Sequence, residues 1–265
     1  MGLFRDLRKG IEIRRRLKAA PPILIFQMGK VGSTSLQGSL KKMWPGLTVH
    51  SHTVTRDLAR NKEDVQLLYE RVIQRGAPLY VISPVREPIG RNIAMFFQNF
   101  ERHTGVAYKK ATFSTAELIR IFLTKFDHDG PANYYDRFFK PVLAVDVYDY
   151  DFPFDGVQII HQNDTHVLLM RTELPDSVKE GAVREFLNLS DFRLSNRNIG
   201  AQKHYADTYR KFIEAFIAPD WYIRRMYDSR FFNHFYGENH RQRLIMEWTQ
   251  RREMKAQGSQ NRDCA

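Results

Sequence analysis

Two basic residues and two histidines stand where short apolar stretches of the sequence end. Lys30 follows the first of these stretches, His50 and His52 close the second, and Arg86 follows the third. Lysine and arginine neutralise phosphate-like anions, whereas histidine takes up and releases protons near neutral pH. The combination predicts a site that binds an anion and holds a base beside it.

The segment 23–36 has the pattern of a short strand, a glycine-spaced loop and the start of a helix. Glycines allow tight turns, the N–H groups at a helix N-terminus attract anions, and a lysine adds a full positive charge. The pattern predicts a phosphate site, and an ordinary strand-to-helix turn with good N-cap residues is the alternative. The candidate binding residues are Gly29, Lys30, Val31, Gly32, Ser33, Thr34 and Ser35.

The order of residues in this loop differs from that of a Walker A loop, which ends with lysine directly before a hydroxyl residue. Lys30 instead precedes a run of hydroxyl residues. This order resembles the 5′-phosphosulfate loop of sulfotransferases that use 3′-phosphoadenosine 5′-phosphosulfate (PAPS). The family also has R-[DE]-P after a later strand, and Arg86-Glu87-Pro88 matches it. Since a guanidinium forks onto phosphate oxygens and stays charged, it suits the clamp on the 3′-phosphate.

The resemblance implies further nucleotide contacts. Arg91 would bind near the 3′-phosphate. The family usually has a serine where this chain has Ala94, and either Asn92, Gln98, Asn99 or a backbone group replaces it or the selectivity for the 3′-phosphate is weaker. Many sulfotransferases close a late basic loop over the nucleotide, and a polar loop of that kind occurs at 195–203, with a plain solvent-facing loop as the alternative. Its candidate residues are Arg197, Asn198 and Lys203.

The two histidines close a predicted strand over 47–53. Alternate residues of a strand share a face, and ligands of open α/β sheets bind beyond the carboxyl ends of the strands. Some polysaccharide 2-O-sulfotransferases carry a similar His-x-His, which implies that His52 is the base and that His50 supports it. Half of a metal site and two surface histidines are the alternatives, but no further ligands follow at a convincing spacing.

The reaction that the resemblance implies is in-line transfer of a sulfuryl group from PAPS to a hydroxyl. Lys30 would neutralise charge on the leaving phosphate, while the loop holds the 5′ end. Because sulfate carries fewer charges than a terminal phosphate, we expect no metal in this reaction.

The pattern of elements predicts an α/β fold with a mostly parallel central sheet flanked by helices, as one domain over residues 21–255. The resemblance implies the P-loop-NTPase-like fold of sulfotransferases. A basic helix is expected over 1–20 and a disordered tail over 256–265. Later strands are predicted at 141–146, 157–160 and 167–170, and helices at 114–125, 176–188, 205–217, 221–227 and 238–255.

The composition favours anionic partners. Lys and Arg number 41 against 30 Asp and Glu, for a formal net charge of +11, and a single cysteine excludes a disulfide framework. The start of the chain has no continuous apolar core, so residues 1–18 are expected to lie on a membrane surface rather than cross it. The chain also resembles bacterial proteins assigned to capsular polysaccharide synthesis, which implies a cytoplasmic enzyme, peripheral to a membrane if that helix binds one, with a carbohydrate acceptor.

Two other functions fit parts of the sequence. A nucleotide-dependent kinase would use 142–146 as a Walker B-like strand that holds magnesium, but its lysine and hydroxyl residues would be in the wrong order. A non-catalytic basic module would bind nucleic acid or a membrane through the positive charge. That module leaves the ordered pair of phosphate elements unexplained, so we expect a carbohydrate acceptor and no nucleic acid.

Overall fold

The computed structural model describes residues 2–54, 62–195 and 204–248 of the chain. The chain forms two compact units. Unit 1 comprises residues 1–86 and 133–199, and unit 2 comprises residues 87–132 and 200–265. The prediction of one domain over 21–255 stays a prediction, and the tail predicted over 256–265 lies outside the described residues.

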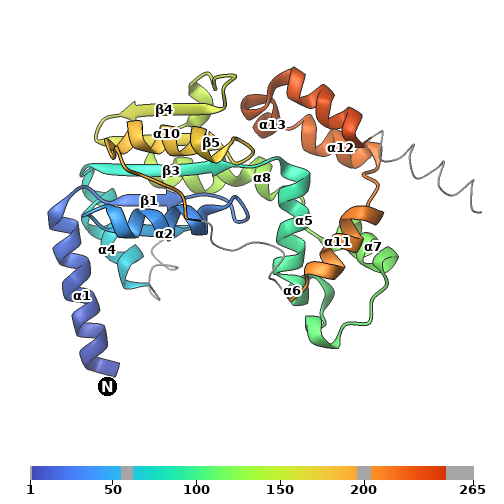
Figure 1. Cartoon of the computed structure of the whole chain (residues 1–265), viewed down its shortest axis with the longest axis horizontal. Helices are drawn as coiled ribbons and strands as arrows, with labels where there is room; N and C mark the ends of the chain where they lie inside the picture. The colour runs from blue at the N-terminus through green and yellow to red at the C-terminus, as the bar shows by residue number, and fades with distance from the viewer. Residues whose placement is uncertain (1, 55–61, 196–203, 249–265) are drawn as a thin grey trace, which may run out of the picture. The chain divides into compact units, whose positions relative to one another are not determined.

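Unit 1 is built on a five-stranded sheet in the order β2-β1-β3-β5-β4 (Figure 1). All neighbouring strands are parallel except β4 and β5, which form an antiparallel hairpin. The mixed α/β class and the mostly parallel sheet are therefore confirmed. The strands are β1 Ile23–Phe26, β2 Thr48–Ser51, β3 Leu79–Val85, β4 Val157–Gln162 and β5 Thr165–Arg171.

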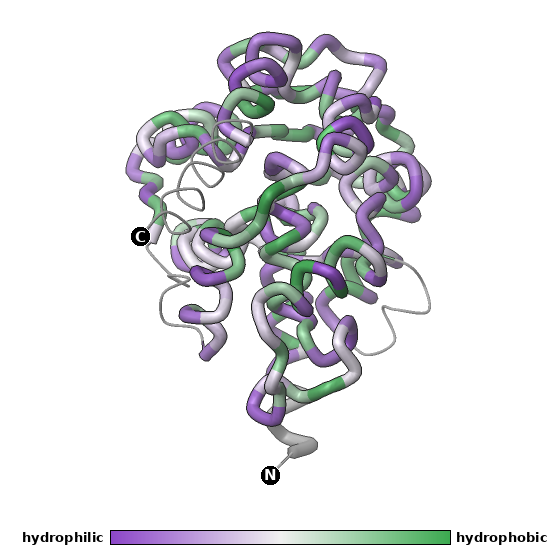
Figure 2. The backbone as a smooth tube through the Cα atoms, turned by 90° about the vertical axis from the view of Figure 1, so that its right-hand side faces the viewer, coloured by the Kyte–Doolittle hydropathy of each residue, from purple (hydrophilic) through white to green (hydrophobic). Residues whose placement is uncertain are grey.

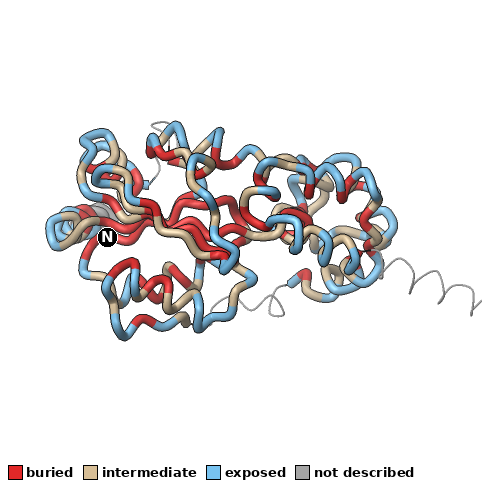
Figure 3. Tube along the Cα trace, turned by 90° about the horizontal axis from the view of Figure 1, so that it is seen from above, coloured by how far each residue is buried: buried red, intermediate tan, exposed pale blue. Residues whose placement is uncertain are grey.

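Helices cover both faces of this sheet because its strands are apolar on both sides. On one face, Ile25 belongs to a core shared with Leu40 of α2 and Val183 of α10. On the other face, the ring of Phe26 stacks on Phe139 at 5.5 Å. Figure 3 shows the buried strands between more exposed segments. The helical elements are α1 Gly2–Ala19, α2 Ser33–Met43, α4 Glu63–Arg71, η1 Ile73–Arg75, η3 Tyr135–Phe139, α9 Lys140–Leu143, η4 Val147–Asp149 and α10 Asp176–Leu187.

The strand predicted at 141–146 is wrong. Residues 140–143 form α9, and the chain then turns at Ala144, whose φ is 55°. A short apolar run does not distinguish a strand from a buried helical turn. The side chain of Asp146 accepts from the backbone of Tyr148 and pairs with Lys140 at 2.6 Å. The kinase alternative therefore loses its Walker B-like strand.

Unit 2 is helical around a core of aromatic rings. Phe96, Phe122 and Phe212 are fully buried, and their ring centroids lie 5.5–6.1 Å apart. The helices predicted at 114–125, 205–217 and 221–227 are confirmed. The helix predicted at 238–255 is present over 237–248, and its remainder lies outside the described residues. α8 Gly130–Tyr134 crosses the boundary between the units. The other elements are α5 Pro88–Gln98, α6 Phe100–Thr104, η2 Tyr108–Lys110, α7 Thr115–Lys125, α11 Ala206–Ala215, α12 Asp220–Tyr227 and α13 Arg230–Phe235.

Hydrophilic and hydrophobic stretches alternate along the helices (Figure 2). Among the described residues, no helix is both long and apolar enough to span a bilayer. The N-terminal helix predicted over 1–20 is present as α1. Its contact with a membrane surface stays a prediction.

Candidate anion-binding site

The loop after β1 is held in two left-handed turns. Lys30 has a φ of 77°, and Gly32, which precedes the first residue of α2, has a φ of 71°. Only glycine adopts this conformation without cost. Strained residues of this kind gather at functional sites. A lysine at such a position costs backbone energy that a glycine would not, which points to a use for its side chain.

The remaining loop residues differ in exposure. Gly29, Val31 and Ser33 are buried, whereas Thr34 is exposed and Ser35 is half-buried. Ser33 is the first residue of α2, as the sequence predicted. The hydroxyl of Thr34 therefore reaches solvent, while that of Ser33 lies inside unit 1.

Arg86 brings the second predicted phosphate element to this loop. It directly follows β3, and its Nη1 donates to the carbonyl oxygen of Lys30 at 2.9 Å. β1 lies between β2 and β3, so the chain reverses direction across the sheet between β1 and β3. Open α/β sheets bind ligands at such a switch point, beyond the carboxyl ends of the strands. Lys30 and Arg86 both lie at this switch point, after the carboxyl ends of β1 and β3.

A polar cluster forms at the same ends of β1 and β2. The amide nitrogen of Gln27 lies 2.8 Å from Ser33 Oγ and 2.9 Å from His50 Nε2. Ser33 Oγ and His50 Nε2 are themselves 3.0 Å apart. The rings of His50 and His52 meet edge to face, with centroids at 5.1 Å. The structure therefore brings the predicted histidine pair to the first turn of α2.

The protonation of His52 follows from its partner. His52 Nδ1 lies 3.0 Å from the carbonyl oxygen of Gln27, which can only accept a hydrogen bond. The shorter of the two Gln27 contacts at Nδ1 is the one to this carbonyl, since the side-chain amide nitrogen lies at 3.3 Å, and it favours a proton on Nδ1, which leaves Nε2 as the basic nitrogen of the neutral ring. The side chain of His52 is exposed, so this nitrogen belongs to a ring that solvent reaches.

His50 has a different character. Burial, followed by the charges of His52 and Lys62, lowers the pKa of His50 to about 4. The ring is neutral at physiological pH because this value lies well below 7. His50 is therefore an acceptor or donor that orients Ser33 and Gln27, and His52 is the better placed of the two to act as a base.

Gln27 is the residue that the sequence analysis missed. Its polar side-chain amide is fully buried at the end of the apolar strand β1. Its side chain touches Ser33, His50 and His52, which come from two different segments. A polar residue between a buried strand and a glycine loop is the only signal that the sequence offers for this role.

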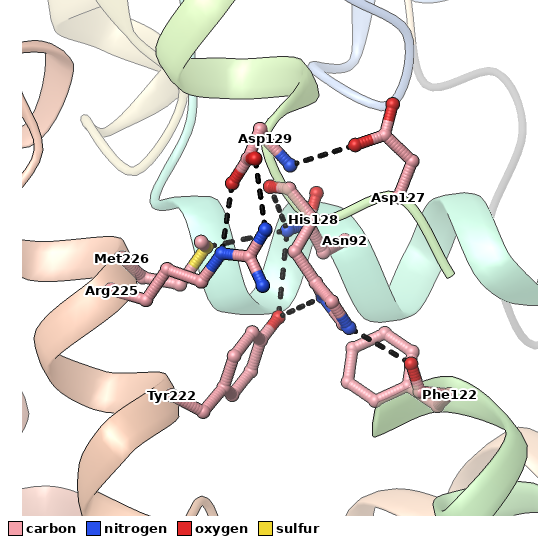
Figure 4. Close-up of polar contacts among 8 residues, drawn as sticks. All are labelled: Asn92, Phe122, Asp127, His128, Asp129, Tyr222, Arg225 and Met226. Atoms are coloured by element: carbon pink, nitrogen blue, oxygen red, sulfur yellow. Dashed lines mark hydrogen bonds and ion pairs between the residues drawn. The ribbon is translucent and has the colours of Figure 1, made fainter. Parts of the chain in front are cut away.

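Arg91 and Asn92 belong to unit 2, where both are buried. Asn92 is fully buried, and its amide donates to the carbonyl oxygen of His128 at 3.0 Å (Figure 4). Arg91 Nη1 donates to the side-chain oxygen Oδ1 of Asn92 at 3.0 Å. An amide enclosed in this way ties α5 to the chain around His128. We therefore leave Arg91 and Asn92 out of the binding residues.

Arg197, Asn198 and Lys203 lie outside the described residues. Ala94 is half-buried on α5 of unit 2. Within residues 2–54, 62–195 and 204–248, no group of three or more His, Cys, Asp or Glu side chains could hold a metal ion.

Substitutions at the two left-handed residues, Lys30 and Gly32, should change the stability in opposite directions. Replacing Lys30 by glycine should raise the free energy of unfolding by about 0.5–1 kcal/mol, because the left-handed backbone loses its steric cost. Gly32→Ala should lower it by about 1 kcal/mol, since alanine is strained at a φ of 71° while its Cβ meets no atom within 4 Å. Urea unfolding of the wild type and both variants measures these changes in the free energy of unfolding. A Lys30→Gly variant less stable than the wild type would contradict the expectation.

The second half of the chain is similar to a known family. Residues 106–237 match a family model, NKWYS, described as "Putative capsular polysaccharide synthesis protein". No curated protein and no solved structure matches the chain. The matched stretch begins after Arg86 and therefore does not include the glycine loop or the histidine pair. The description points to capsular polysaccharide synthesis as the role of the family that this stretch resembles.

Proposed function

We propose that the protein is a PAPS-dependent sulfotransferase of the P-loop-like type that transfers a sulfuryl group to a hydroxyl of a carbohydrate. The observation that carries the proposal is the contact between Arg86 and the Lys30 carbonyl at the switch point of the sheet. It joins two cationic elements into one anion site. The order of these elements along the chain resembles that of PAPS-dependent sulfotransferases.

The donor would lie between these elements. The 5′-phosphosulfate would contact Lys30, the loop amides and the exposed hydroxyl of Thr34, and the other loop residues would shape the cradle. The 3′-phosphate would meet Arg86, whose guanidinium has five N–H donors, one of which goes to Lys30. Both ends of the donor would then be held by fixed positive charge. We propose no metal in this site.

The transfer step would use His52 as the base. His52 Nε2 would take the proton of the acceptor hydroxyl as that oxygen attacks sulfur. The bond between sulfur and the bridging phosphate oxygen would break, and 3′-phosphoadenosine 5′-phosphate (PAP) would leave with the electron pair. Lys30 would neutralise the negative charge that grows on the leaving oxygen. His50 and Gln27 would position His52 and Ser33.

A carbohydrate acceptor is supported by the description of the matched family. The formal net charge of +11 suits an anionic polysaccharide better than a neutral one. A cytoplasmic location and the absence of a nucleic-acid partner remain part of the proposal.

The experiment that tests the donor is a thermal-shift titration without metal. PAP should raise the melting temperature more than AMP, which lacks only the 3′-phosphate, because a ligand that binds the folded state stabilises it. Arg86→Ala should remove the difference between the two nucleotides. Arg120→Ala, at an exposed arginine of α7 in unit 2, is the control and should keep it. Equal shifts by PAP and AMP in the wild type would count against the proposal.

A further inference from the structure

A second cationic site lies in unit 1, at the opposite ends of the strands from the candidate anion-binding site. A cavity of about 660 Å³ opens beside the segments that lead into β1 and β3. Pro21 and Pro22 come directly before β1, and Ala77 and Pro78 come directly before β3. Because the glycine loop and Arg86 follow the carboxyl ends of these same strands, the cavity is separate from them.

Four basic side chains line this cavity. Arg14 and Lys18 come from α1, and Arg71 and Arg75 come from the end of α4 and from η1. Arg14 and Lys18 have the i, i+4 spacing on α1, and like charges at that spacing repel on an α-helix. None of the four forms an ion pair with a carboxylate in the described part of the chain. The cavity thus gathers four positive charges that no ion pair in the described part of the chain neutralises.

The rest of the lining is apolar. It consists of Leu17, Ala19, Ala20, Pro21, Pro22, Val72, Ala77 and Pro78. Among the described residues, no acidic side chain lines the cavity. An anion with an apolar body next to it therefore matches this cavity better than a bare ion or a polar sugar.

The helix that supplies half of the cavity has features of a membrane-surface helix. α1 is rich in arginine and lysine, and its Ile11 side chain is 56% exposed. Ile13, in contrast, is buried against unit 1. Basic helices with exposed apolar residues lie at the surface of anionic membranes.

We propose that this cavity binds the phosphate headgroup of an anionic membrane lipid, with the adjacent glycerol and acyl carbons against the proline and leucine lining. Arg71 and Arg75 reach the phosphate from one side, and Arg14 and Lys18 reach it from α1. The site attaches unit 1 to a membrane surface while the carboxyl ends of the strands carry the candidate anion-binding site. This inference does not depend on sulfuryl transfer.

The test is sedimentation of the full chain with vesicles. We expect binding to vesicles of equal parts phosphatidylcholine and phosphatidylglycerol, and little binding to phosphatidylcholine alone. Arg71→Gln/Arg75→Gln should weaken the binding by roughly tenfold or more, since each cation near an anionic surface contributes substantially. The variant leaves α1 unchanged, so a loss of vesicle binding would report on the cavity.

The matched control is Arg15→Gln/Arg16→Gln, which removes the same charge from α1. These two arginines pair with Glu12 and do not line the cavity. We expect this control to weaken binding by less than about threefold. Equal losses in both double variants would overturn the proposal in favour of a general charge effect. Failure of the wild type to bind the mixed vesicles would also overturn the proposal. So would an Arg71→Gln/Arg75→Gln variant that binds the soluble polyanion heparin more weakly but binds the vesicles as the wild type does.

Discussion

Replacing His52 by glutamine is expected to lower kcat for acceptor-dependent formation of PAP by about 10²–10⁴-fold, the usual contribution of a general base. The reason is that the Gln27 carbonyl oxygen, 3.0 Å from Nδ1, favours a proton on Nδ1 and leaves Nε2 as the basic nitrogen. Glutamine keeps a hydrogen-bond donor but lacks the base.

The rate measured against pH separates this role from a structural one. If His52 is the base, the wild type should lose rate on the acid side, and that limb should be absent in the residual activity of His52→Gln. His161→Gln is a matched control, because His161 is an exposed histidine on β4 of the same unit. A His52→Gln variant with wild-type kcat would contradict the assignment.

Acid should destabilise the protein through His128 in unit 2. This ring is 2% exposed, with Nε2 at 2.9 Å from the Phe122 carbonyl oxygen and Nδ1 at 3.1 Å from the Tyr222 hydroxyl (Figure 4). Burial lowers the pKa of His128 to about 4. In the unfolded chain the pKa of histidine is about 6.5, so below that pH the unfolded state binds a proton that the folded state does not.

The free energy of unfolding should therefore fall as the pH drops from about 6.5 to about 4, and His128 accounts for about 3 kcal/mol of that loss. Above pH 6.5 this contribution to the pH dependence vanishes. Urea unfolding of the wild type at several pH values measures the slope. His128→Gln should have a lower stability at neutral pH and a shallower slope, whereas an unchanged slope would show that another group is responsible.

The candidate site was predictable where its signals are local. The strand, the glycine loop and the start of α2 are consecutive in sequence, so the position of Lys30 and Ser33 followed from the pattern. The role of Gln27 was not predictable, because it depends on the register that pairs Ile25 with His50 in the neighbouring strand. That register places Gln27 beside His52, and nothing in a single segment encodes it.

Two further features depend on contacts that the sequence does not show locally. Asn92 follows Arg91 at the start of an apparent helix, and its sequence neighbours do not reveal that His128 and Met226 enclose it. The run over 141–146 is apolar enough for either a strand or a helical turn, and Pro141 in the first turn of α9 favours the helix.

The most direct test of the central claim is isothermal titration calorimetry of the wild type with PAP, AMP and ATP, first with a chelator and then with added magnesium. If Lys30 and Arg86 form one site for a 3′-phosphorylated nucleotide, PAP should bind at least about tenfold more tightly than AMP, since each charge-assisted contact contributes about 1.5–3 kcal/mol. ATP should bind more weakly than PAP and should gain nothing from added magnesium. Tighter binding of ATP that requires magnesium, or no binding of PAP, would contradict the assignment.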